Sequence, residues 1–260
     1  ETGYIKNKLI IKFIKKLVNY IYKNVDYIFV QSKYFKKNIL AFNDDYKKKL
    51  WVYENPSEDF SKLKVINKKI KQKTKIITYS GNIGHAQDLN VFIELAKKFR
   101  KNDDKFIIHI FGEGSLKNDL ILKTKENKLN KHIKIFKHLK PNIIHKELLK
   151  SDFLLITLKG SSAFSKTIPG KFQTYLYFAK PLIVISDGYI IEKIKKYSLG
   201  EWCHTGNYID LYKKIILLSN DKNKIKLYSK NCRSLYKDKY NLKYSVECLL
   251  NKFNELVYKN

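Results

Sequence analysis

Residues 75–115 read KIITYSGNIGHAQDLNVFIELAKKFRKNDDKFIIHIFGEGS, and their pattern indicates the fold class. It opens with an apolar run at 75–79, continues with a helical pattern at 88–101 and returns to an apolar run at 106–111. Short apolar runs that alternate with helices are typical of parallel strands, because each crossover must lay a helix back on the sheet. The stretch therefore predicts a strand–helix–strand unit.

The same alternation continues towards the C-terminus. Further apolar runs lie at 133–136, 153–157 and 182–185. Helical patterns separate or follow them, at 115–127, 142–150, 171–179, 189–197, 207–219, 222–237 and 242–258. The predicted fold is α/β: a Rossmann-like, doubly wound parallel sheet covered by helices on both faces.

The first 60 residues have a different organisation. Residues 6–24 place apolar side chains at three- and four-residue spacings, with Lys on the other face. This amphipathic helix fits a membrane interface; a helix docked on a sheet, which we favour, has the same pattern. Strands at 26–31 and 50–53 flank a helix at 33–41 for which Ser32 is the expected N-cap.

A lysine-rich connection at 61–73 provides the domain boundary. We expect three parts: the end of a truncated N-terminal domain with its linker at 1–57, a ligand-binding domain at 58–240, and a C-terminal crossing helix at 241–260. The chain contains no Met, so we expect it to be a piece of a longer protein.

The composition excludes several classes of protein. The net charge is +29, but of the 53 basic residues all except Arg100 and Arg233 are Lys. We therefore expect no nucleic-acid partner, because base and phosphate recognition uses Arg forks; a diffuse positive face still suits an anionic membrane surface. The three Cys are widely spaced, which argues against a disulfide framework or a zinc site.

The glycines indicate a ligand site. Only ten are present, and six of them follow predicted strands: Gly81, Gly84, Gly112, Gly114, Gly160 and Gly170. In an open parallel sheet these loops meet at the carboxyl ends of the strands, where ligands bind. Backbone N–H groups in the loop 79–84, just before a helix, could cradle a phosphate; tight strand-to-helix turns would need the same glycines.

A cation at the start of the helix 171–179 points to the same ligand class. Lys171 follows Pro169 and Gly170 in the first helical turn, where the helix dipole disfavours positive charge. A cation there is explained if an anion also binds there. Of two other candidates, His85 could contact phosphate or sugar or face solvent, and Glu113 could orient a sugar hydroxyl.

Six segments together resemble the family-4 retaining GT-B glycosyltransferases, especially the bacterial polysaccharide and O-antigen branch with N-acetylfucosamine-type transferases. They occur in this order: DYIFVQSKYFKKNI, ENPSEDF, YSGNIGHAQDL, FGEGSLKNDL, SDFLLITLK and IPGKFQTYLYFAKPLI. The resemblance implies two Rossmann-like domains with the active site between them. This chain would hold the C-terminal, donor-binding portion.

The resemblance also implies which residues bind the donor. Those expected to hold the diphosphate and the nucleotide sugar are Ser80, Gly81, Asn82, Gly84, His85, Gly112, Glu113, Pro169 and Gly170. Lys171 would be the catalytic residue that neutralises the leaving phosphate. Members of the family carry two Glu where this chain has Lys166 and Thr174; the second usually holds the ribose, a contact that Gln173 or Thr174 would replace.

The implied reaction transfers a sugar from a UDP-linked donor to a lipid-linked or saccharide acceptor with retention, in cell-surface polysaccharide biosynthesis. It needs no metal or other cofactor and no protein nucleophile. The enzyme would lie at the cytoplasmic face of the membrane, with its missing N-terminal domain in the same gene or on a second chain. Two alternatives stay open: a non-catalytic basic protein that binds membranes or polyanions, and a GT-B sugar-nucleotide epimerase.

Overall fold

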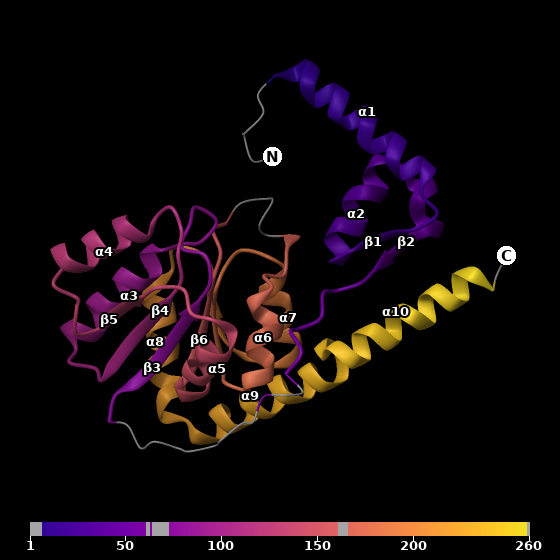
Figure 1. Cartoon of the computed structure of the whole chain (residues 1–260). Coiled ribbons are helices and arrows are strands. Elements are labelled where there is room, and N and C mark those ends of the chain that lie inside the picture. The colour runs from indigo at the N-terminus through magenta and orange to yellow at the C-terminus, as the bar shows by residue number, and fades with distance from the viewer. Residues whose placement is uncertain (1–6, 61–62, 64–72, 161–165, 259–260) are drawn as a thin grey trace.

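A six-stranded parallel sheet forms the centre of the computed structural model, which describes residues 7–60, 63, 73–160 and 166–258 (Figure 1). The strand order is β5-β4-β3-β6-β7-β8, and each neighbouring pair is parallel. The strands are β3 (Lys75–Ser80), β4 (Phe106–Phe111), β5 (Ile133–Phe136), β6 (Phe153–Thr157), β7 (Leu182–Ile185) and β8 (Gly200–Cys203). The predicted doubly wound α/β fold is confirmed.

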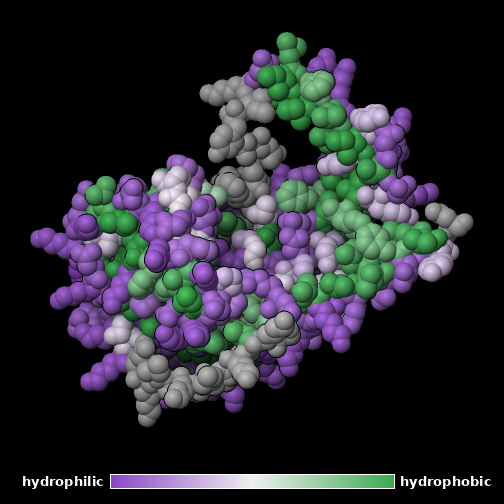
Figure 2. All heavy atoms as spheres, in the orientation of Figure 1, coloured by the Kyte–Doolittle hydropathy of each residue, from purple (hydrophilic) through white to green (hydrophobic). Residues whose placement is uncertain are grey.

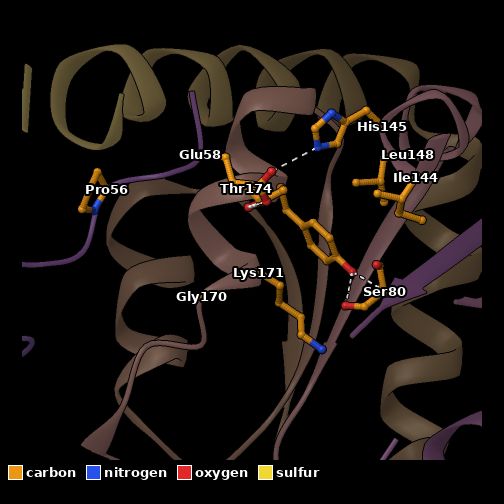
Figure 3. A pocket seen from close by; sticks show the side chains of 10 residues that line it. Pro56, Glu58, Ser80, Ile144, His145, Leu148, Gly170, Lys171 and Thr174 are labelled. Atoms are coloured by element: carbon orange, nitrogen blue, oxygen red, sulfur yellow. Dashed lines mark hydrogen bonds and ion pairs between the residues drawn. The ribbon is translucent and has the colours of Figure 1, made fainter. Parts of the chain in front are cut away.

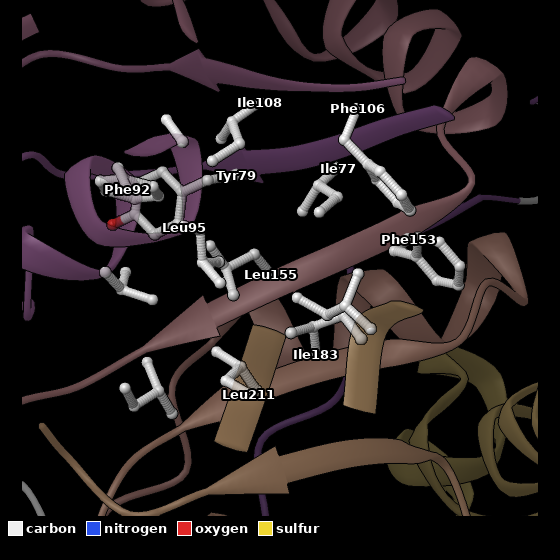
Figure 4. Close-up of a cluster of buried hydrophobic side chains, with 14 of the residues drawn as sticks. Ile77, Tyr79, Phe92, Leu95, Phe106, Ile108, Phe153, Leu155, Ile183 and Leu211 are labelled. Carbon is white, nitrogen blue, oxygen red and sulfur yellow. The ribbon is translucent and has the colours of Figure 1, made fainter. Parts of the chain in front are cut away.

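Helices cover both faces of the sheet because its central strands are apolar on both sides. In β6, Phe153 and Leu155 belong to one core cluster, and the alternate residues Leu154 and Ile156 belong to the other. The first cluster, drawn in Figure 4, includes residues of α3 (Asn90–Lys101), α4 (Lys117–Glu126) and α8 (Tyr208–Asn220). The second includes residues of α5 (Pro141–Lys150), α6 (Lys171–Phe178) and α7 (Tyr189–Tyr197). Both clusters receive side chains from α9 (Lys222–Leu235).

A smaller unit precedes the sheet. It contains α1 (Lys8–Asn24), β1 (Ile28–Val30), α2 (Lys33–Phe42), a 3-10 helix η1 (Asp44–Lys49) and β2 (Leu50–Val52). β1 and β2 pair in parallel, and their apolar side chains form a small separate core. Ser32 caps α2 as predicted, since its Oγ accepts a hydrogen bond from the N–H of Phe35 at 3.2 Å.

The C-terminal helix returns to this smaller unit. A π-helical turn η3 (Tyr236–Tyr240) leads into α10 (Leu242–Val257), and the ring of Phe253 lies 5.7 Å from that of Phe29 in β1. The hydroxyl of Tyr53 also donates to the carbonyl of Ser245 at 3.2 Å. α10 therefore joins both parts of the molecule. The exact domain boundaries stay predictions, and most of the lysine-rich connection at 61–73 lies outside the described residues.

Several features differ from the sequence prediction. β8, the 3-10 helix η1 and the π-helical turn η3 were not predicted. α3 and α4 each begin two residues later than expected, at Asn90 and Lys117, and neither has a side-chain N-cap. Within the described part of the chain, no helix combines the length and apolar character needed to cross a bilayer.

Candidate functional site

The order of the strands reverses between β3 and β6, which places the topological switch point at their carboxyl ends. The loop after β3 and the end of β6 are joined there. The N–H of Lys159 donates to the carbonyl of Ala86 at 2.9 Å, and the N–H of Asp88 donates to Oγ1 of Thr157 at 3.2 Å. The glycine-rich loops after β3 and β4 therefore lie where open α/β sheets bind ligands.

These two loops pack directly against each other. The N–H of Gly81 donates to the carbonyl of Phe111 at 2.9 Å, and the N–H of Ile83 donates to the carbonyl of Glu113 at 2.8 Å. A Cβ on Gly112 would lie 1.9 Å from the carbonyl oxygen of Gly81, which itself has a φ of +146°. Both glycines are thus required by the backbone, as the tight-turn interpretation predicted.

Most N–H groups of this loop, which we expect to cradle a phosphate, already donate hydrogen bonds within the protein. Besides Gly81 and Ile83, Gly84 is engaged, since its N–H donates to Oε1 of Gln87 at 3.2 Å. α3 begins only at Asn90, so its N-terminus does not directly follow Gly84. Among the described residues, none accepts a hydrogen bond from the N–H of Asn82, whose side chain is exposed. Asn82 is the member of the loop left for a ligand.

Lys171 is the most unusual residue of this edge. Its Nζ is shielded from solvent and has no hydrogen-bond partner among the described residues. It lies 3.6 Å from the ring centroid of Tyr79, and a Cβ on Gly81 would be 2.8 Å from it. Burial lowers the pKa of Lys171 to about 7. An ammonium in such a place is costly unless an anion joins it.

A second residue of α6 fixes the end of β3. The hydroxyl of Tyr175 accepts a hydrogen bond from the N–H of Ser80 at 2.8 Å, while the hydroxyl of Tyr79 donates to the carbonyl of Asn82 at 2.6 Å. Both tyrosines are buried. Together they hold the loop after β3 over the first turn of α6, so Lys171 and the glycine loop form one site.

A pocket of about 380 Å³ opens beside Lys171 (Figure 3). It lies between α5, α6, the end of β3 and the linker that follows β2, residues 53–60, and Thr174 and Ser80 contribute to its wall. Sequence reasoning missed six of its lining residues, and three of these carry polar groups: Glu58 on the linker, His145 on α5 and Tyr175 on α6. Their contacts connect segments far apart in the chain, and no local pattern marks them.

The two candidates for the ribose contact, Gln173 and Thr174, lie in different surroundings. Gln173 is buried, and in its hydrogen-bonded orientation its amide nitrogen lies 2.9 Å from the carbonyl oxygen of Gly170 and 3.2 Å from that of Pro169. The amide of Gln173 thus braces the turn that starts α6, and Gln173 does not line the pocket; that it replaces the ribose contact stays a prediction. Thr174 does line the pocket.

His85 and Glu113 are exposed on the edge loops. A carboxylate oxygen of Glu113 lies 2.6 Å from Nζ of Lys117 and accepts a hydrogen bond from the N–H of His138 at 3.3 Å. The hydrogen bond from Lys117 is the main cause that lowers the pKa of Glu113. Glu113 is thus directed towards the loop after β5, and its proposed contact with a sugar stays a prediction.

Comparison with known proteins identifies one family. The family model described as "Glycosyl transferases group 1" matches residues 61–235. Comparison with curated protein sequences found no match.

Solved structures share the fold. The chain is similar to HepE from Anabaena in complex with UDP (TM-score 0.81, 10% identity, 98% of this chain and 70% of that one). It is also similar to a glycosyltransferase from Rickettsia africae (TM-score 0.74, 17% identity, 95% and 68%). A third similar structure is Staphylococcus aureus TarM in complex with UDP (TM-score 0.66, 18% identity, 97% and 48%). The chain thus spans about half of TarM and about two thirds of the other two; at these identities the likeness establishes the fold.

Proposed function

This chain belongs to the glycosyl transferases group 1, and from that premise we propose that it binds a UDP-linked sugar and takes part in transferring the sugar to an acceptor. The observation that carries the proposal is the buried Nζ of Lys171 beside Gly81, at the switch point of the sheet, for which the described part of the chain offers no hydrogen-bond partner. A diphosphate at this place would supply the missing counter-charge. The UDP present in the HepE and TarM structures supports the choice of nucleotide.

The chemistry follows from where charge develops. When the bond between the sugar and the diphosphate breaks, negative charge grows on the diphosphate, and a cation in a site shielded from water stabilises that charge strongly. Lys171 would serve this purpose, with the N–H of Asn82 as an additional donor. With no nucleophile of the protein required, we propose attack of an acceptor hydroxyl from the side of the departing diphosphate, which retains the configuration, and no metal.

The acceptor side would be completed outside this chain. The described residues of the smaller unit form two strands, and the chain spans 48–70% of the similar structures named above. We propose that a further N-terminal portion, on the same gene product or on a second chain, binds a lipid-linked or saccharide acceptor. The segments quoted from the sequence favour cell-surface polysaccharide or O-antigen synthesis in a bacterium.

Location at the cytoplasmic face of a membrane is proposed from α1. Apolar side chains gather over this helix (Figure 2), and Leu9, Phe13 and Leu17 are 78%, 67% and 47% exposed. Lys residues interleave with them along the helix. An exposed apolar stripe with flanking Lys suits the surface of an anionic bilayer. If this property were the whole function, the chain would be a non-catalytic membrane-binding protein, for which nucleotide binding would be absent.

Calorimetry with UDP, GDP and inorganic phosphate tests the proposal. We expect UDP to bind, and Lys171→Met to weaken it at least about tenfold, because the variant removes the buried countercharge. Lys226→Met, which removes an exposed Lys of α9, is the matched control and should bind as the wild type does. Absence of binding to every one of these ligands, or unchanged UDP affinity in Lys171→Met, would refute the donor site.

A further inference from the structure

The pocket beside Lys171 has two chemically different ends (Figure 3). One end carries Lys171 and the open turn at Gly170, where an added Cβ would meet nothing within 4 Å. The other end carries Glu58, whose carboxylate comes from the linker and not from the sheet domain's own helices. Its volume of about 380 Å³ falls at the lower end of the range for pockets that hold small organic ligands. A ligand that fits both ends must be anionic at one end and offer hydrogen-bond donors at the other.

Glu58 is held in place although it is exposed. Its Oε1 accepts a hydrogen bond from Oγ1 of Thr174 at 3.4 Å, and its Oε2 lies 3.4 Å from Nε2 of His145. The side chain is still 53% exposed, so its carboxylate retains capacity to accept further hydrogen bonds. Both contacts are long, which leaves them replaceable by a ligand's hydroxyl groups.

The linker on both sides of Glu58 is anchored. The N–H of Ser57 donates to the carbonyl of Tyr240 at 2.8 Å. Phe60 is buried and stacks on Tyr177 with ring centroids 4.1 Å apart. Because the chain is held in place both before and after Glu58, this residue cannot move away from the pocket unless these contacts break. Its position is therefore a built feature of the site.

We infer that Glu58, assisted by Thr174, accepts hydrogen bonds from the vicinal hydroxyls of the ribose of a nucleoside diphosphate whose phosphates lie at the Lys171 end. The inference rests on the proposed function. A carboxylate has two acceptor oxygens and suits a pair of neighbouring hydroxyls, and such charge-assisted bonds are stronger than neutral ones. The residue that selects a ribonucleotide would then belong to the linker between the two parts of the molecule.

The test compares UDP, 2′-deoxy-UDP and inorganic diphosphate by calorimetry. We expect the wild type to prefer UDP over 2′-deoxy-UDP by about tenfold or more, the value for one hydrogen bond to a charged group. Glu58→Gln should bring this ratio close to one. Its affinity for inorganic diphosphate should stay equal or rise, because a nearby negative charge has been removed.

Two further variants sharpen the result. Glu126→Gln makes the same change of charge at an exposed site on α4 and should keep the wild-type ratio. Thr174→Val, which keeps the shape of the side chain, should reduce the ratio in part. If Glu58→Gln retains the preference for UDP, the inference is overturned while the donor site stands. If the wild type binds no UDP at all, the proposed function and the inference fail together.

Discussion

At the scale of single residues, Lys171 couples ligand binding to pH. Burial lowers its pKa to about 7 in the free protein, so above pH 7 the side chain is mostly in its neutral amine form. A bound diphosphate favours the charged form and raises this pKa again. Below pH 7 the residue is already protonated and binding takes up no proton at Lys171. Between pH 7 and the raised pKa, binding must capture one.

We therefore predict that the affinity for UDP falls as the pH rises from 7 to 9, by up to about tenfold per pH unit, since one pKa unit corresponds to about 1.4 kcal/mol. This range lies above the second ionisation of a phosphate, about pH 6, so the ligand's own charge changes little. Calorimetry in two buffers with different ionisation enthalpies measures the proton uptake directly. Lys171→Met should show no such slope; an identical slope in the variant would assign the effect to another group.

Replacement of glycine by alanine should have opposite effects on the free energy of unfolding at Gly112 and at Gly170. Gly112→Ala would place a Cβ 1.9 Å from the carbonyl oxygen of Gly81, and we expect a loss of about 1–3 kcal/mol from overpacking. Gly170 has helical dihedral angles, and a Cβ there would meet nothing within 4 Å. Gly170→Ala should therefore add about 0.4–1 kcal/mol by restricting the unfolded chain. Urea denaturation measures both, and equal destabilisation by the two variants would contradict the packing described.

At the scale of elements, the sequence predicted most of the sheet and failed where local signals are weak. β3, β4, β5, β6 and β7 are four- to six-residue runs with mostly apolar side chains, which periodicity detects. β8 (Gly200–Cys203) contains a glycine and a buried Glu201 whose carboxylate is satisfied by Lys224 and Tyr228 from α9. Its pairing with β7 is a tertiary effect that no local pattern reveals. The π-helical turn η3 likewise depends on contacts of Tyr240 with the distant linker.

The buried carboxylate of Glu54 joins the linker to α7 and to η3. Nζ of Lys193 lies 2.6 Å from Oε1 of Glu54, and these side chains are only 6% and 7% exposed. The hydroxyl of Tyr240 also donates to Glu54. Burial alone would raise the pKa of Glu54, but the hydrogen bonds from Lys193 and Tyr240 outweigh it and lower that pKa. The carboxylate thus stabilises the fold above its unfolded pKa, and this contribution is lost as the pH falls through the folded pKa.

We predict that Glu54→Gln lowers the free energy of unfolding at neutral pH by about 3–5 kcal/mol, the cost of leaving a buried charge without its partner. The difference from the wild type should shrink at acid pH, where Glu54 itself becomes protonated. Asp103→Asn breaks an ion pair with Lys105 whose side chains are 89% and 64% exposed, and should cost much less, because water already screens this pair. Chemical denaturation across pH measures these values. Equal costs for the two variants would show that burial does not strengthen the Glu54 pair.

At the scale of the whole molecule, the site is assembled from segments that lie far apart in the sequence and are recognised there by separate patterns. Gly81, Gly112 and Lys171 were predicted to meet because they follow or approach parallel strands, and they do. The contact between Glu58 and Thr174 spans 116 residues and was not predicted, although the sequence already left the ribose contact open at Thr174. Loop glycines and helix starts can be recognised from neighbouring residues in the sequence. A linker side chain such as that of Glu58 reaches the site only because of how the two parts of the molecule are arranged.

The exposed apolar side chains of α1 and the net charge of +29 together suit a membrane surface. We expect the chain to bind vesicles that contain anionic lipid, and to bind zwitterionic vesicles much more weakly, because diffuse positive charge attracts the surface and the apolar stripe of α1 then inserts. Replacing Leu9, Phe13 and Leu17 by Ser should release most of the protein in a flotation assay. UDP affinity should not change, since α1 contributes no residue to the pocket.

The control for this prediction uses apolar side chains that are exposed elsewhere. Leu122 on α4 and Leu217 on α8 are 56% and 71% exposed, and their replacement by Ser should leave vesicle binding intact. Raising the ionic strength from about 0.05 to 0.5 M should weaken wild-type binding, since added salt shortens the range of the attraction. If the α1 variant floats with vesicles as the wild type does, charge alone accounts for the binding. The apolar face of α1 would then be left to pack against further protein, where a sheet larger than the pair β1 and β2 could cover it.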